Sequence, residues 1–148
     1  MAGPAQTPGV TAVTLERGTP DERGASFTLA AEQLDLLTRL GAPKDLHVAS
    51  ILPGHVRGNH YHALRGEAIV VIHEDRWSLR YDAGDGTKVT SRAFTGAGVV
   101  AITVPPLAAH AIRNDGERPL WLLAWSDGPY DNALPDAHRR VLIEPAGP

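Results

Sequence analysis

The sequence predicts an all-β fold, a small barrel or sandwich of short strands with one short N-terminal helix. Among its 148 residues are 15 glycines and 12 prolines, which interrupt the chain at short intervals, as a fold with many turns requires. Short apolar segments lie between these interruptions at regular spacing. Antiparallel closure of such strands removes exposed sheet edges, so a barrel or sandwich is expected.

The helix is predicted from Thr28 to Gly41. Thr28 can cap the first turn with its hydroxyl group, and Gly41 is a typical residue at the end of a helix. Leu36, Leu37 and Leu40 form one apolar stripe at helical spacing. We therefore expect this helix to pack on the outside of a sheet.

The strands are predicted from apolar runs that end at turn residues. Asp82-Ala-Gly-Asp-Gly86 and Asn114-Asp-Gly116 are typical hairpin connections. The tail holds one short apolar run, Val141–Ile143, which can add an edge strand or cover the barrel. The predicted strands are residues 46–52, 68–73, 77–81, 88–94, 99–104, 110–113 and 120–126.

Composition limits the class of protein. We expect residues 1–10 to form a loose arm and residues 11–148 to form a single domain. A net charge of −3 without a basic stripe argues against a nucleic-acid partner. The chain has no cysteine, no signal-peptide pattern and no apolar run long enough to cross a membrane, which together predict a cytoplasmic protein.

Three histidines and one glutamate predict a metal site. His60 and His62 are two residues apart on an extended segment, so their side chains point to the same face. Glu67 follows across the loop 63–66, which must turn or bulge because the odd offset of five positions from His62 would put the two side chains on opposite faces of one straight strand. His110 arrives from a distant strand. Imidazole and carboxylate ligands suit one divalent ion such as Zn, Fe, Ni or Mn.

The segment around His60 resembles the first signature of the cupin superfamily, and this resemblance implies a jelly-roll β-barrel. That signature has glycine, five residues, His-x-His, three or four residues, and glutamate. Gly54, His60, His62 and Glu67 match each of these positions. The glycine that usually follows seven residues later is replaced by Glu74.

The second cupin signature is matched in part. Its pattern is Pro-x-Gly-x-x-His-x-x-x-Asn, and Pro105, His110 and Asn114 fit it. Leu107 stands where the pattern has glycine, which can reshape the turn before His110. The two segments together cover residues 54–114.

Within the superfamily, the segment 57–62 is most similar to cupins of polysaccharide and deoxysugar biosynthesis. This resemblance implies a nucleotide-linked keto-sugar as substrate, with a secondary-metabolite intermediate as the alternative. Related sugar ketoisomerases of this fold work without metal and lack the glutamate, so Glu67 favours the metal-dependent branch. Small cupins commonly pair, and we expect a homodimer formed through apolar sheet edges.

Three residues are predicted to act on the substrate. His73 shares strand parity with Glu67 and is either a core histidine or, if it faces the cavity, a general base. Tyr81 can supply a phenol for proton transfer. Arg57 can bind an anionic substrate or orient the ligands, although a solvated loop residue is an equal alternative.

His47 and Ser50 lie on opposite faces of the strand 46–52, so at most one of them lines the pocket.

Three functions stay open at this point. The first is isomerisation, epimerisation or cyclisation next to a carbonyl group that the metal polarises. The second is an Fe(II)-dependent oxygenase, since the same ligands with vacant positions activate O₂. The third is a non-catalytic barrel that binds a small molecule.

Overall fold

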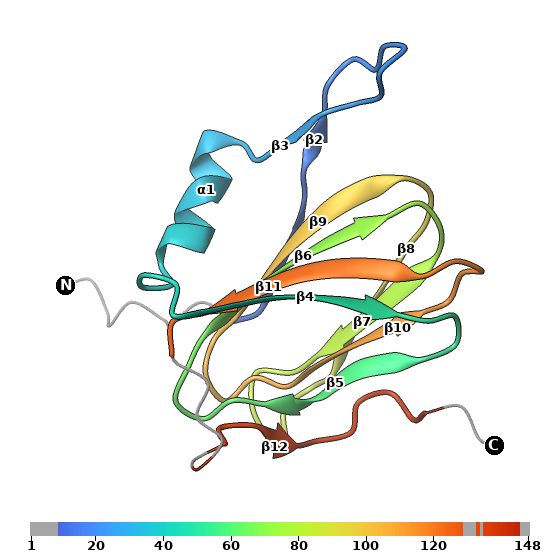
Figure 1. Ribbon diagram of the computed structural model, residues 1–148. Coiled ribbons are helices and arrows are strands. Elements are labelled where there is room, and N and C mark those ends of the chain that lie inside the picture. The colour runs from blue at the N-terminus through green and yellow to red at the C-terminus, as the bar shows by residue number, and fades with distance from the viewer. Residues whose placement is uncertain (1–8, 129–132, 134, 146–148) are drawn as a thin grey trace.

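A computed structural model describes residues 9–128, 133 and 135–145. Two five-stranded antiparallel sheets face each other, and a single helix lies outside them (Figure 1). The apolar core fills the space between the sheets, with Ile69 and Val100 from one sheet and Trp77, Leu79 and Ile112 from the other. The jelly-roll arrangement predicted from the sequence is confirmed, although the two sheets do not close into one continuous barrel.

The first sheet has the strand order β1-β9-β6-β11-β4. Its strands are β1 (Thr11–Thr14), β9 (Gly98–Val104), β6 (Glu67–His73), β11 (Leu120–Ser126) and β4 (Asp45–Ile51).

The second sheet has the strand order β12-β5-β10-β7-β8. Its strands are β12 (His138–Arg139), β5 (Val56–Tyr61), β10 (His110–Asn114), β7 (Trp77–Tyr81) and β8 (Thr90–Phe94). A separate ribbon joins β2 (Glu16–Arg17) to β3 (Phe27–Thr28).

The helix is shorter than predicted. Helix α1 spans Ala31–Thr38, and Ala30 precedes it without a side-chain capping hydrogen bond. The prediction that Thr28 caps the helix is wrong, because Thr28 belongs to β3 and pairs with Glu16 of β2. None of the residues of α1 is fully buried, so the helix covers its sheet loosely.

The predicted strands correspond to β4 and to β6 through β11, and the bounds of β7 and β11 agree with the prediction. Val141–Ile143 forms no strand, but Ile143 is buried and covers the end of the molecule. Most of the predicted N-terminal arm, residues 1–8, lies outside the described residues, and Val10 packs against the core. In the described ranges, no helix is long and apolar enough to span a membrane.

Candidate metal centre

The four predicted ligands come together at one end of the space between the sheets. Donor atoms of His60, His62 and Glu67 lie within 4.8 Å of one another. His62 Nε2 is 3.1 Å from Glu67 Oε2, and His110 Nε2 is 3.8 Å from the same oxygen. The His60 and His110 rings meet edge to face with centroids 4.9 Å apart. The carboxylate of Glu67 is therefore the common neighbour of the imidazoles.

Both sheets contribute residues to this site. His60 near the end of β5 is paired directly with His110 at the start of β10. Glu67 is the first residue of β6 in the opposite sheet. The loop 62–66 crosses from one sheet to the other, as the spacing between His62 and Glu67 predicted. His60, Glu67 and His110 thus sit on strands, which hold a site more firmly than loops do, and His62 directly follows β5.

A β-bulge in β5 controls which side chains face the interior. The pairing of β5 with β10 shifts by one residue between His110 and Ala111. At the bulge, Gly58 has a φ of 96° and Asn59 a φ of 55°. Without the bulge, Arg57 and His60 would lie on opposite faces, because they are three residues apart. With it, Arg57 is paired with the core residue Ile112 and lines the same cavity as His60.

The electrostatics of the site favour the protonation states that a metal requires. Burial lowers the pKa of His60 to about 4, and the neighbouring histidines act in the same direction. Burial also lowers the pKa of His110. Burial opposes the charge on Glu67, yet the hydrogen bond from His62 and the surrounding histidines hold its pKa at about 2. Two imidazoles are therefore neutral and the carboxylate is ionised at neutral pH, as metal ligands must be.

His62 differs from the other two histidines because both of its ring nitrogens have an acceptor. Nδ1 donates to the carbonyl oxygen of Asp136 at 2.6 Å, and Nε2 lies against Glu67. Although burial opposes the charge, these hydrogen bonds raise the pKa of His62. The Asp136 carboxylate in turn accepts hydrogen bonds from the backbone of Ala63 and Leu64. Nothing in the sequence indicates this backbone contact, which fixes the orientation of the ring and leaves Nε2 as the atom available to a metal.

A cavity of about 410 Å³ opens beside the ligands. His60, Glu67 and His110 line it together with Arg57 and with His47 from β4. His47 is therefore the member of the His47/Ser50 pair that faces the cavity. The sequence contains a signal for this choice, because the apolar residue Ile51 shares strand parity with His47 and is buried.

The other two predicted catalytic residues are placed differently. His73 is buried, as its parity predicted, but it ends β6 at a distance of about 20 Å along the strand from Glu67. Its ring contacts Trp77 and Phe94, and its Nδ1 donates to the carbonyl oxygen of Gly96. It is a core histidine in this arrangement. Tyr81 is paired with His110 across β7 and β10, and it packs against the core beside the site.

Leu107 has a backbone conformation that normally favours glycine. Its φ is 74°, in the left-handed region that leucine rarely adopts. The backbone N–H of Leu107 donates to the carbonyl oxygen of His62 at 2.7 Å. The turn before His110 is therefore linked to the turn after His62 despite the departure from the cupin pattern.

Two antiparallel sheets with three histidines and a glutamate at one end define a cupin fold, and the resemblance predicted from the sequence is confirmed. The family described as the polysaccharide biosynthesis C-terminal domain matches residues 31–138. This match covers more than half of the chain, so the protein belongs to that family. No curated protein matches the chain.

Several solved structures share the fold. CapF, a capsular polysaccharide assembling protein from Staphylococcus aureus, aligns with a TM-score of 0.60 at 19% identity over 85% of this chain and 34% of CapF. QdtA, a sugar 3,4-ketoisomerase from Thermoanaerobacterium thermosaccharolyticum, gives a TM-score of 0.61 at 14% identity over 88% of both chains. The RmlC epimerase of Mycobacterium tuberculosis gives 0.68 at 15% identity over 92% of this chain and 70% of RmlC. The chain thus spans about a third of CapF, and these likenesses establish the fold.

Proposed function

We propose that this protein is a metal-dependent isomerase or epimerase that acts next to the carbonyl group of a nucleotide-linked keto-sugar. The observation that carries the proposal is the convergence of His60, His62 and His110 on Glu67 beside an open cavity. Membership of a polysaccharide biosynthesis family supports the sugar as substrate class. The fold is also that of QdtA, a variant of which was crystallised with TDP-4-keto-6-deoxyglucose.

The four residues fit a divalent ion, because they offer three imidazole nitrogens and one anionic oxygen in a largely buried cluster. An ion held there polarises a carbonyl oxygen and makes the neighbouring C–H bond more acidic. Arg57 stands at the cavity with its Nε donating to the carbonyl oxygen of Ser50 at 2.8 Å. This contact holds its guanidinium in place, and the remaining N–H groups can bind a phosphate of the substrate.

The test uses the full chain purified without added metal. We expect elemental analysis to find about one divalent ion per chain, and Glu67→Gln to lower that content while His55→Asn, an exposed loop change, leaves it unaltered. Incubation with TDP-4-keto-6-deoxyglucose in D₂O should introduce deuterium next to the keto group without consuming oxygen. Oxygen consumption by an iron-loaded protein would instead identify an oxygenase. Binding of the sugar nucleotide without exchange would identify a non-catalytic barrel.

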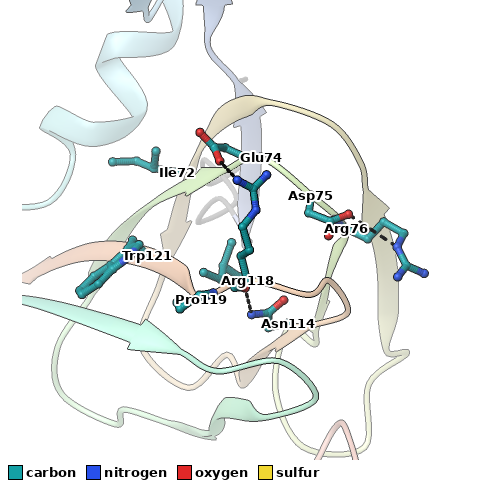
Figure 2. A pocket seen from close by; sticks show the side chains of 9 residues that line it. Ile72, Glu74, Asp75, Arg76, Asn114, Arg118, Pro119 and Trp121 are labelled. Carbon is teal, nitrogen blue, oxygen red and sulfur yellow. Dashed lines mark hydrogen bonds and ion pairs between the residues drawn. The ribbon is translucent and has the colours of Figure 1, made fainter.

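We also propose that the protein forms a homodimer through the outer face of the first sheet. Four large apolar side chains on this face are more than half exposed, namely Leu46 (64%), Val48 (63%), Ile72 (55%) and Trp121 (53%). Ile72 and Trp121 are cross-strand partners, and a depression of about 330 Å³ lies beside them (Figure 2). The ion pair between Arg118 and Glu74 borders this depression. A border with both charges suits a second copy of the same surface.

Light scattering at micromolar concentration tests the dimer. We expect the mass of two chains for the natural protein and of one chain for Trp121→Ser. Leu64→Ser is the matched control, because Leu64 is 87% exposed in the loop between β5 and β6. A monomer before any substitution would overturn this proposal. The cytoplasmic location remains a prediction from the sequence.

A further inference from the structure

His47 lines the cavity but is not one of the proposed metal ligands. It lies on β4 in the first sheet, and its ring lines the same cavity as His60, Glu67 and His110. Its side chain is 52% exposed, so it can exchange protons with solvent. Among the described residues that line this cavity, it is the remaining imidazole once the three ligands are assigned.

A carboxylate accompanies His47. Asp45 Oδ2 is 3.7 Å from His47 Nδ1, and the Asp45 side chain is 26% exposed. Asp45 is paired with Ser126 on β11, and Ser126 is paired with Glu67 on β6. The pair therefore lies in the same sheet as Glu67, two strands away. An aspartate beside one ring nitrogen orients the imidazole.

The residues between His47 and the metal ligands leave room for a substrate. His47 is paired with Ala124, and Ala124 is paired with Ile69, the next interior position after Glu67. Two strand spacings place the backbone of His47 about 10 Å from that of β6. Because alanine fills little of this gap, a sugar ring can lie between His47 on one side and His60 and His110 on the other.

We propose that His47, oriented by Asp45, moves the proton in the reaction of this site. The inference deepens the proposed function and rests on it. The imidazole nitrogen that faces the cavity accepts the proton from the carbon next to the carbonyl group. The electron pair of that C–H bond forms the C=C bond of an enolate, and the carbonyl π pair moves onto oxygen. Return of a proton from water to the opposite face of that carbon gives the epimer, and His47 releases its proton to solvent, so the reaction needs no oxidant or reductant.

Other ionisable residues line the cavity in which this proton transfer takes place. Arg57 on β5 and Glu67 on β6 also line the cavity, and His60 and His110 complete its ionisable lining. Nε2 of His62 and Nε2 of His110 lie beside Glu67 Oε2, His60 belongs to the same group of donor atoms, and His73 lies far along β6. The geometry therefore leaves His47 as the base within reach of a bound substrate.

The first experiment measures deuterium exchange into TDP-4-keto-6-deoxyglucose by the full, metal-loaded chain. We expect His47→Asn to slow exchange by about 100-fold or more, the usual contribution of a general base, without loss of bound metal. Asp45→Asn should slow exchange less than His47→Asn does, and Asp45→Glu, which keeps a carboxylate beside the ring, should restore part of the rate. His55→Asn, in the exposed loop before β5, is the matched control and should exchange at the original rate.

The outcomes separate this inference from the proposed function. If the natural protein catalyses exchange and His47→Asn does so within about threefold of the same rate, the role of His47 is overturned while the proposed function stands. A general base would contribute far more than threefold. A second measurement does not depend on turnover. Diethyl pyrocarbonate should modify His47 in the free protein, and saturating TDP-4-keto-6-deoxyglucose should protect it while His55 stays reactive. Equal modification of His47 with and without the nucleotide sugar would also overturn the inference.

Discussion

Replacing Gly58 with alanine tests whether the bulge in β5 sets the position of His110. Gly58 has a φ of 96°, where an L-residue is strained by about 1–2 kcal/mol. A Cβ at this position would lie 2.6 Å from the carbonyl oxygen of His110 and 3.1 Å from Cα of Ala111. Both atoms belong to the backbone of β10, so the strand itself must move. Overpacking of this kind costs about 1–3 kcal/mol more.

Gly54 provides the matched control for this substitution. Its φ is 79°, and a Cβ there would meet no atom within 4 Å. Gly54→Ala should therefore show the conformational cost alone, about 1–2 kcal/mol. Gly58→Ala should exceed it by at least about 1 kcal/mol, which corresponds to roughly 2–4 °C in Tm.

Urea denaturation, followed by tryptophan fluorescence, measures both costs. A zinc titration of each variant measures the effect on the site. We expect only Gly58→Ala to weaken zinc binding, because only this substitution displaces the backbone next to a ligand. Equal stability of the two variants, or unchanged zinc affinity in Gly58→Ala, would refute the role of the bulge.

Three further predictions concern the backbone, the tail and the pH dependence. Leu107→Gly should raise the free energy of unfolding by about 0.5–1 kcal/mol, because relief of left-handed strain exceeds the entropy cost of glycine; thermal unfolding would contradict this if Tm fell. Asn59→Ala should lower stability by about 1–3 kcal/mol and expose the segment 140–143 to proteolysis, since Asn59 makes three hydrogen bonds to Leu142 and Ile143; an unchanged cleavage pattern would contradict it. In chelator-treated protein, stability should fall as pH drops from about 6.5 to about 4, because the unfolded chain protonates His60 before the folded chain does. Unfolding curves across this range test the sign, and His60→Asn should flatten the slope.

The sequence predicted the strands well because apolar runs ended by Gly, Pro, Asn and Asp are a local signal. It failed for the helix start, where the pairing of Thr28 with Glu16 across the β2–β3 ribbon overrides the local preference of threonine for a cap. The short strands β1 to β3 were missed for a related reason. Their pairing partners, not their composition, make them strands.

The grouping of the four candidate ligands was predictable because the cupin pattern gives their spacing, whereas the rest of the site depends on distances that spacing does not contain. Strand parity placed His73 correctly in the interior, but parity says nothing about position along the strand. Period-two counting also places Arg57 on the opposite face from His60. The bulge at Gly58 and Asn59 reverses this, and a single sequence offers only the Gly-Asn pair as a hint.

The same bulge links the site to the tail of the chain. Because Asn59 adopts a φ of 55°, its side chain points away from the cavity. There its Nδ2 donates to the carbonyl oxygen of Ile143, and its Oδ1 accepts hydrogen bonds from the backbone N–H groups of Leu142 and Ile143. The result is that one irregularity directs His60 inward and anchors residues 142–143 outside.

Arg140 extends this support to the second half of the metal centre. Its guanidinium lies over the ring of Tyr61 at 4.2 Å and pairs with the buried carboxylate of Asp82 at 3.1 Å. Asp82 in turn accepts a hydrogen bond from the backbone N–H of Ala109, next to the ligand His110. The tail therefore contacts the strand that carries His60 and the turn that positions His110. Arg140 contacts none of the candidate ligands and lies outside the cavity. Arg140→Ala should nevertheless weaken metal binding, because the residues that it supports hold His60 and His110 in position. A zinc titration checks this, and unchanged affinity would contradict it.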